Sequence, residues 1–354
     1  MSSLHRFTRR TFAAVAGAAT LTMMLAACSG GATETASEDD GSYGDVAIQL
    51  SWIKNTEFAG EFFAEERGYF ADAGFDSVEL VPGPSATEAA VISGAATIGL
   101  GNAISAGTVI ANEGAPITII GTTYQKNPFT IISLEDEANI TKAEELKGKK
   151  IGVQSSNMNL WEAFLALNDL TLEDVDTVTV EFDPTPLFTG EVDGWFGYVT
   201  NEYLDAELQG LKPVNLAFAD NGMPFVAESL IVNTADIENN REMLKALLVA
   251  EIKGWTDAVN ETDEAARLAV EVFGKDLGLT AEKELLQAQI QAETLIVSAE
   301  TEANGLFTIS EELQEASITT LKAAGITITA DKLFDMSLLA EVYAENPELL
   351  KYKK

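Results

Sequence analysis

From Val46 onward, short runs of β-forming residues alternate with segments in which apolar residues recur at helical spacing. This alternation limits the fold more than any other feature, because parallel strands need a crossover and a helix usually supplies it. The pattern therefore predicts an α/β fold with a parallel sheet. The expected strands of this part are 46–50, 78–81, 96–100 and 117–120, and the expected helices are 58–70, 88–93 and 103–113.

A second α/β unit is predicted to begin where the chain crosses out of the first one, around residues 122–129. Its expected strands are 129–132, 150–153, 177–180 and 192–198, the last running into a loop, and its expected helices are 143–147 and 159–168. Residues 226–232 are expected to cross back, and a helical C-terminal region follows from Asn239. We predict two lobes joined by two strands, with 46–125 and 230–354 in lobe 1 and 126–229 in lobe 2. A cleft between the lobes is the expected ligand site, and hinge closure is its expected motion.

The charge of the chain excludes one class of partner. Its 354 residues include 56 acidic and 22 basic ones, which gives a formal net charge of −34. Such a chain repels phosphate backbones, so we expect no nucleic-acid binding.

One histidine, His5, and one cysteine, Cys28, occur in the sequence. Both fall in a segment with the pattern of a processed leader, so neither is expected to provide active-site chemistry. That excludes Ser-His-Asp triads, Cys-His pairs, and zinc or haem held by His or Cys. No cofactor or metal site is predicted, whereas chemistry based on carboxylates, lysine or tyrosine stays open.

Residues 1–27 have the pattern of a signal peptide, with three arginines before an apolar stretch that is shorter than the roughly 20 residues of a membrane span. The stretch ends in Leu25-Ala26-Ala27-Cys28, which matches the bacterial lipobox, although an ordinary secretory signal with an incidental cysteine is the alternative. Thr8–Phe12 also resembles a twin-arginine motif, so both export routes stay open. Residues 28–45 are predicted to be a flexible tether. We therefore expect an extracytoplasmic protein that Cys28 anchors to the cell membrane through lipid.

Several segments, in the same order along the chain, resemble one family. They are 50–60 (LSWIKNTEFAG), 66–70 (ERGYF), 92–99 (ISGAATIG), 144–153 (EELKGKKIGV), 190–195 (GEVDGW) and 201–203 (NEY). Together they make the region 46–235 similar to the solute-binding lipoproteins of the NMT1/THI5-like (SsuA/THI5) group, which feed ATP-driven importers. The resemblance implies the two-lobed periplasmic-binding-protein fold of type II. It also implies a monomer that delivers a small molecule to an ABC permease.

The resemblance further implies a ligand class. In the NMT1/THI5-like branch the ligands are thiamine pyrimidine precursors or, in some relatives, riboflavin, and the ring lies against aromatic side chains. The match at Asn201-Glu202-Tyr203 favours this branch over the sulfonate binders. The eukaryotic enzymes of the branch use an active-site histidine and a cysteine-rich motif. Because this chain has neither beyond its leader, we expect a binding protein and not an enzyme.

Loops at the carboxyl ends of strands bind ligands in open α/β sheets, and four such loops hold candidate residues. The first offers Trp52, Asn55, Glu57 and Phe58. Trp52 would either stack on a flat ring or belong to the core.

The second and third loops open helices. Asn102 in the second, and Ser155, Ser156 and Asn157 in the third, would either leave backbone N–H groups free for a ligand or simply cap the helix.

The fourth loop is the richest, with Trp195 and Tyr198 as aromatic faces and Asn201 and Glu202 as hydrogen-bonding groups. Tyr124, at the first crossing, is a candidate for the site or for the hinge.

Basic residues are scarce in these loops, which favours a neutral or weakly cationic aromatic ligand over sulfonate, nitrate or phosphate. Helix N-termini alone can bind an anion, so a sulfonate or nitrate binder stays as the alternative. A carboxylate-based extracellular hydrolase, with Glu57 and Glu202 as its acid and base, is a second alternative. A structural or adhesive lipoprotein explains neither the α/β alternation nor the aromatic loops.

Overall fold

The structure, a computed structural model, describes residues 42–353. The predicted signal peptide, Cys28 and the predicted tether up to residue 41 lie outside the described residues. The first strand, β1 (Gly44–Gln49), begins inside the segment predicted as a tether, because its backbone already pairs with a neighbouring strand from Gly44. No helix within residues 42–353 is long and apolar enough to cross a membrane.

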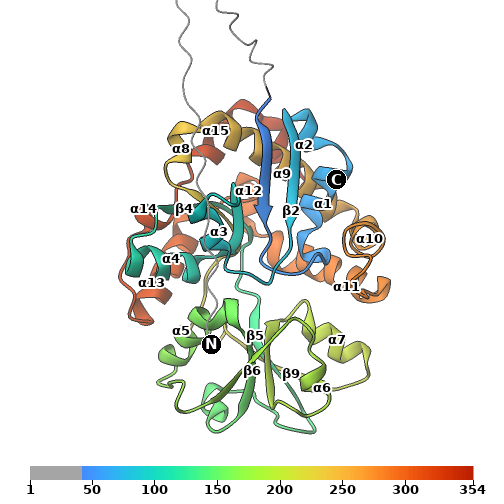
Figure 1. Cartoon of the computed structure of the whole chain (residues 1–354), viewed down its shortest axis with the longest axis vertical. Coiled ribbons are helices and arrows are strands. Elements are labelled where there is room, and N and C mark those ends of the chain that lie inside the picture. The colour runs from blue at the N-terminus through green and yellow to red at the C-terminus, as the bar shows by residue number, and fades with distance from the viewer. Residues whose placement is uncertain (1–41, 354) are drawn as a thin grey trace, which may run out of the picture. The chain divides into compact units, whose positions relative to one another are not determined.

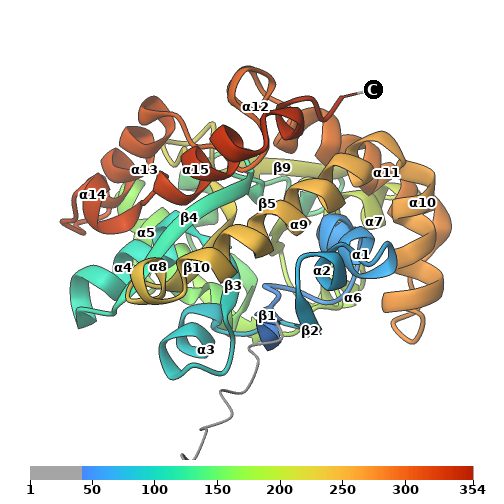
Figure 2. The same ribbon diagram turned by 90° about the horizontal axis from the view of Figure 1, so that it is seen from above.

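The first sheet contains β1, β2 (Phe75–Val81), β3 (Ile98–Asn102), β4 (Ile117–Tyr124) and β10 (Ala227–Asn233). Their order in space is β2-β1-β3-β10-β4. Figure 1 labels β2 and β4, the two edge strands, and Figure 2 labels all five. The strands β1, β2 and β3 run parallel, whereas β10 is antiparallel to both of its neighbours. All residues of β3 and β4 are buried, and neither strand contains a charged residue.

The second sheet contains β5 (Phe129–Leu134), β6 (Lys150–Gln154), β7 (Asp176–Val180), β8 (Gly194–Tyr198) and β9 (Pro213–Ala217). Their order is β7-β6-β8-β5-β9, with β5 antiparallel to β8 and β9. Both sheets are therefore mixed: the predicted parallel strands are present in each, and β5 and β10 run antiparallel to their neighbours. The reason is that β5 and β10 enter their sheets from the edge at which the parallel strands end.

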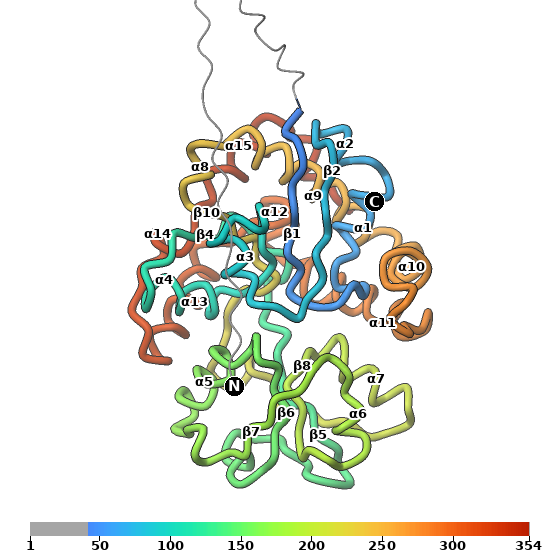
Figure 3. Tube along the Cα trace, in the orientation of Figure 1, coloured from blue at the N-terminus to red at the C-terminus, as the bar shows by residue number. Residues whose placement is uncertain are grey.

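Residues 125–128 and 218–226 connect the two sheets (Figure 3). They are tied to each other, since Asn127 Nδ2 donates to the carbonyl oxygen of Met223 at 2.7 Å and the Phe218 N–H donates to the carbonyl oxygen of Phe129 at 3.0 Å. The expected return crossing at 226–232 is displaced, because most of that segment is β10 inside the first sheet.

Helices pack around both sheets, and most of those after β10 lie on the first sheet or on its helices. Figure 2 shows the longest of them, α9, with α1 and α15 on either side. The helix predicted at 58–70 is split at Gly68, whose φ of 71° is left-handed. The α-helices are α1 (Ala59–Glu66), α2 (Tyr69–Asp72), α3 (Thr87–Ser93), α4 (Ala103–Glu113), α5 (Met158–Leu167), α6 (Thr185–Phe188), α7 (Glu202–Leu208), α8 (Asp236–Asn239), α9 (Arg241–Asn260), α10 (Thr262–Arg267), α11 (Ala281–Gln291), α12 (Ala299–Asn304), α13 (Glu311–Ala323), α14 (Ala330–Leu333) and α15 (Ser337–Glu345). The 3-10 helices are η1 (Thr56–Phe58), η2 (Ala143–Leu146), η3 (Ser155–Asn157) and η6 (Pro347–Leu350), and the π-helices are η4 (Leu268–Phe273) and η5 (Ala292–Ile296).

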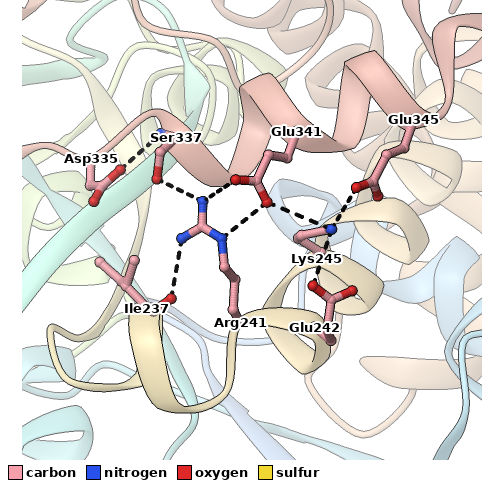
Figure 4. A network of polar contacts seen from close by, with 8 residues as sticks. All are labelled: Ile237, Arg241, Glu242, Lys245, Asp335, Ser337, Glu341 and Glu345. Atoms are coloured by element: carbon pink, nitrogen blue, oxygen red, sulfur yellow. Dashed lines mark hydrogen bonds and ion pairs between the residues drawn. The ribbon is translucent and has the colours of Figure 1, made fainter.

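A charged network joins α9 to α15 (Figure 4). Arg241 meets Glu341 through two nitrogens, Nε to Oε2 at 3.0 Å and Nη2 to Oε1 at 2.7 Å. Lys245 Nζ, one turn further along α9, lies 2.8 Å from Glu345 Oε1. Because the Arg241–Glu341 pair is bidentate, it fixes the register between the two helices as well as their proximity.

Candidate functional site

A cavity lies between the two sheets. The carboxyl ends of parallel strands from both sheets form its walls: Ser51 follows β1, Asn102 ends β3, Gln154 ends β6 and Tyr198 ends β8. Loops converge at this edge of a parallel strand set, which is why ligands bind there.

Four glutamate side chains line the cavity, and no lysine or arginine is among its described lining residues. Glu57, Glu88, Glu202 and Glu228 are all buried, and none is more than 8% exposed. Such a site accepts hydrogen bonds and attracts positive charge. Within residues 42–353, no group of three or more His, Cys, Asp or Glu side chains is placed to hold a metal ion.

Glu57 and Glu228 meet at a single hydroxyl. Ser51 Oγ lies 2.9 Å from Glu228 Oε2 and 3.3 Å from Glu57 Oε1. The Tyr198 hydroxyl, from the second sheet, donates to Glu228 Oε1 at 2.8 Å. Glu228 therefore connects the two sheets across the cavity.

The backbone at Glu228 is unusual. Its φ is +46°, in the left-handed region that favours glycine, and it lies where the pairing of β10 with β3 shifts between Ala227 and Ser229. A strained residue of this kind persists only where its surroundings hold it, and such residues cluster at binding and catalytic sites. The bulge places an acidic side chain in the cavity from a strand that is otherwise apolar.

Glu202 begins α7 and turns back to the preceding strand. Its Oε2 accepts the Tyr198 backbone N–H at 2.9 Å, and its Oε1 accepts Asn201 Nδ2 at 3.0 Å. The carboxylate reaches this position because residue 197 is glycine: a Cβ there would lie 2.5 Å from Glu202 Oε2.

Burial raises the pKa of all four cavity glutamates, since it removes water from the charged form. The negative charge of Glu228 adds to this effect at Glu57, whose pKa is held well above its usual range. Burial raises the pKa of Glu202 to about 7, although the N–H donor of Tyr198 and the charge of Lys283 oppose the shift. Glu88 Oε1 is buried without a hydrogen-bond partner among the described residues, so it is available to a ligand.

A buried cation stands behind Glu202. Lys283, on α11, donates to Asn201 Oδ1 and to Gln287 Oε1, and it lies 3.1 Å from Glu284 Oε1. Glu284 in turn accepts the Thr56 N–H at 2.7 Å and the Thr56 hydroxyl at 2.5 Å. The helix α11 packs on η1 and α9, which belong to the first lobe. Asn201 precedes α7, which belongs to the second lobe. The network around Lys283 therefore joins the two lobes.

Aromatic side chains form the apolar part of the cavity wall. Trp52, Phe129, Phe196 and Tyr198 all line it. Phe129 and Tyr198 meet edge to face, with ring centroids 4.6 Å apart and planes at 88°. These contacts hold the rings in fixed orientations, so they can pack against a flat ligand.

The structure brings most of the predicted site residues together. Those that line the cavity are Trp52, Glu57, Asn102, Ser156, Asn157, Tyr198, Asn201 and Glu202. Asn102 is the helix cap that its position suggested: its Oδ1 accepts the N–H groups of Ile104 and Ser105 at 3.1 and 2.9 Å. These N–H groups are therefore not free for a ligand, whereas the polar side chain of Asn102 still faces the cavity.

The remaining predicted residues lie elsewhere, and the expectation that they face the ligand is corrected. Trp195 is completely buried in a separate small core of the second lobe, because β8 continues through it and turns its side chain to the opposite face. Phe58 belongs to the main core. Asn55 caps η1 by accepting the Glu57 N–H. Tyr124 is buried and donates to Gln291 Oε1 at 2.9 Å, and Ser155 lines an adjoining cavity.

Three important lining residues were not predicted. Glu228 lies inside an apolar run, and no sequence signal marks its bulge. Phe129 opens β5 and was assigned to the strand only. Glu88 follows the Pro-Gly-Pro loop after β2, another loop at the carboxyl end of a strand, and this position was the signal that could have identified it.

Comparisons with known proteins agree with this arrangement. A family model described as NMT1/THI5 like matches residues 55–265. Riboflavin-binding protein RibY of Chloroflexus aurantiacus is 26% identical over 257 residues, which cover 69% of this chain and 72% of that protein. Formylaminopyrimidine-binding protein of Halalkalibacterium halodurans is 25% identical over 249 residues, covering 69% and 74%.

Solved structures show the same fold. The periplasmic aliphatic sulphonate binding protein SsuA of Escherichia coli aligns with a TM-score of 0.59 at 17% identity, over 84% of this chain and 100% of SsuA. The predicted two-lobed fold of the periplasmic binding proteins is thereby confirmed.

Proposed function

Because the chain belongs to the NMT1/THI5-like family, we propose that it is the extracytoplasmic substrate-binding lipoprotein of an ABC importer and captures a small aromatic nitrogen heterocycle by closing its two lobes. The proposal includes the anchor on Cys28 and action as a monomer that delivers its ligand to a membrane permease. The two relatives named above are both called binding proteins, which supports binding without turnover.

The observation that carries the proposal is the charge of the cavity. Four buried glutamates line it, with no lysine or arginine among its described lining residues. A sulfonate, nitrate or phosphate would meet carboxylates where it needs donors, and an Arg fork or a cluster of N–H groups is the usual solution for such anions. The cavity therefore favours a ligand that donates hydrogen bonds.

An aminopyrimidine has the required chemistry. Its amino group donates hydrogen bonds in the plane of the ring, where carboxylates such as Glu202 and Glu88 can accept them. Its faces are apolar and pack against Trp52 and Tyr198. Riboflavin offers a ring N–H and a larger flat surface, so it is the second ligand to test. We favour the pyrimidine because the cavity has more acceptors than the flavin has ring donors.

Thermal unfolding with a ligand panel tests the proposal. The chain from Ser29 onward would be measured with formylaminopyrimidine, hydroxymethylpyrimidine, thiamine, riboflavin, taurine and nitrate. A ligand at about a thousand times its Kd adds roughly 4 kcal/mol to the free energy of unfolding, which raises the Tm by several degrees. A shift with a pyrimidine or riboflavin is expected. A shift with taurine or nitrate alone would refute the choice of ligand class.

A pair of variants on α7 separates the site from general effects of charge. Glu202→Gln removes a buried carboxylate from the cavity, and a lost charge-assisted hydrogen bond of about 1.5–3 kcal/mol predicts a roughly 10- to 100-fold weaker pyrimidine affinity. Glu207→Gln makes the same change at an exposed position of the helix and should leave the affinity unchanged.

A further inference from the structure

We propose that Glu57 and Glu228 hold one proton between them in the ligand-free cavity, and that the positively charged group of a ligand displaces this proton on binding. The inference rests on the proposed function and narrows its substrate class to heterocycles that carry a cationic group. It also makes ligand capture sensitive to external pH.

The count of hydrogens around Ser51 carries the argument. A serine hydroxyl has one hydrogen to donate, yet Ser51 Oγ contacts a carboxyl oxygen of Glu228 at 2.9 Å and one of Glu57 at 3.3 Å. If the Ser51 hydrogen goes to the nearer oxygen, on Glu228, the contact with Glu57 needs a hydrogen from the Glu57 carboxyl itself. Glu228 already receives the Tyr198 hydroxyl at 2.8 Å, so it is the charged member of the pair and Glu57 the protonated one.

The surrounding groups do not neutralise a second charge. Acidic side chains face the pair from three elements: Glu202 from α7, Glu61 from α1 and Glu88 from α3. The hydroxyls of Tyr198 on β8 and Tyr124 on β4 complete the surroundings. Burial raises the pKa of both, and the negative charges of Glu57 and Glu228 raise it further.

The nearest buried cation belongs to another network. Lys283 is already paired with Glu284 and donates to Asn201, behind Glu202. Two buried carboxylates in contact with one hydroxyl and no cation cannot both remain charged at low energetic cost. A proton or a ligand cation has to supply the positive charge, and the two compete for the same place.

The backbone of Glu228 points to a role in binding. Its φ of +46° costs about 1–3 kcal/mol in a residue with a Cβ, and glycine would avoid that cost. The strained conformation places the buried Glu228 carboxylate against the hydroxyls of Ser51 and Tyr198 in the cavity. We therefore assign Glu228 as the carboxylate that receives the ligand cation.

Two matched ligands test the exchange. Formylaminopyrimidine is neutral at its side chain, whereas the amine left after removal of its formyl group is an ammonium at neutral pH. Calorimetry in two buffers of different ionisation enthalpy counts the protons released. We expect about one proton per amine bound and none for the formyl compound. Between about pH 6 and about pH 7.5, the affinity for the amine should rise up to about tenfold per pH unit.

Variants identify the source of the proton. In Glu57→Gln the amine should still bind, but it should release about one proton fewer and its affinity should depend less on pH; the remaining dependence comes from Glu202, whose pKa burial raises to about 7. Glu65→Gln, an exposed change on α1, should behave as the unchanged protein. Binding of the amine without proton release in the unchanged protein, or binding of the neutral ligands only, would overturn the inference and leave the proposed function standing.

A ligand-free measurement separates the two proposals. Infrared spectra at neutral pH report the carbonyl stretch of protonated carboxyl groups, and Glu57→Gln should weaken this band relative to Glu65→Gln. An unchanged band would overturn the inference whatever binds. If neither the pyrimidines nor riboflavin bind, the proposed function fails, and so does the inference that a ligand cation displaces the proton. The infrared band still shows in that case whether Glu57 and Glu228 hold a proton.

Discussion

Replacing Lys283 with methionine tests whether a buried cation on α11 stabilises the contact between the two lobes. The methionine keeps most of the apolar stem, so the change removes mainly the ammonium and its contacts. Those contacts are the ion pair with Glu284 and the hydrogen bonds to Asn201 and Gln287.

The size of the effect follows from burial. The side chain of Lys283 is 6% exposed and that of Glu284 is 0% exposed, so the remaining carboxylate has no access to water. Thr56 still donates two hydrogen bonds to it, but no cation balances its charge. Breaking one side of a buried pair costs about 3–5 kcal/mol, and we expect Lys283→Met to lower the free energy of unfolding by that amount. The double variant Lys283→Met/Glu284→Gln removes both charges and should lose less than about 2 kcal/mol.

Urea unfolding followed by tryptophan fluorescence measures these differences, since urea leaves ion pairs unscreened. Lys322→Met, an exposed change on α13, is the control and should stay within about 0.5 kcal/mol of the unchanged protein. A loss below about 1 kcal/mol in Lys283→Met, or a double variant no more stable than the single one, would refute the reasoning.

Three further predictions concern stability. Burial raises the pKa of Glu61 to about 8 and of Glu202 to about 7, so above pH 4.5 these two groups bind more protons in the native state than in the unfolded chain. The free energy of unfolding should therefore fall as the pH rises towards 8. Urea titrations that show a rise instead would contradict this. Gly254→Ala would place a Cβ 2.1 Å from the Gly60 carbonyl oxygen and should cost about 1–3 kcal/mol by the same assay. Trp195→Ala should cost about 3–5 kcal/mol while leaving ligand affinity, measured by calorimetry, unchanged; weaker binding in a folded variant would return this residue to the site.

Local patterns identified eight of the residues that line the cavity, Trp52, Glu57, Asn102, Ser156, Asn157, Tyr198, Asn201 and Glu202; their part in binding a ligand stays a prediction. Trp52 and Glu57 lie far along the sequence from Tyr198 and Glu202, yet each pair lies at the end of a segment recognisable as a strand. Within each sheet the carboxyl ends of the parallel strands converge at one edge, so identifying the strands was enough to group the side chains of each lobe. That the two edges face each other across one cavity was an expectation from the two-lobed fold.

The errors arose where a single residue departs from its pattern or extends it. Trp195 was assigned to a ligand-binding loop, but β8 runs through to Tyr198 and successive side chains point to opposite faces. Its neighbour Phe196 therefore lines the cavity while Trp195 packs behind the sheet. Glu228 was missed because a bulge and a left-handed φ depend on pairing with β3, which the hydrophobic pattern of β10 does not encode.

The position of β10 has a consequence for how the chain folds. β4 joins the first sheet only through β10, and the bond from the Thr122 hydroxyl to the Ala227 carbonyl oxygen spans 105 residues. All strands of the second sheet, in contrast, follow one another between β4 and β10. Contacts of low sequence separation form early, so the second lobe can assemble while the first still lacks β10, its fifth strand along the chain. A nascent chain at that stage exposes the unpaired edges of both β3 and β4, and delayed insertion of β10 would make these edges the place where aggregation begins.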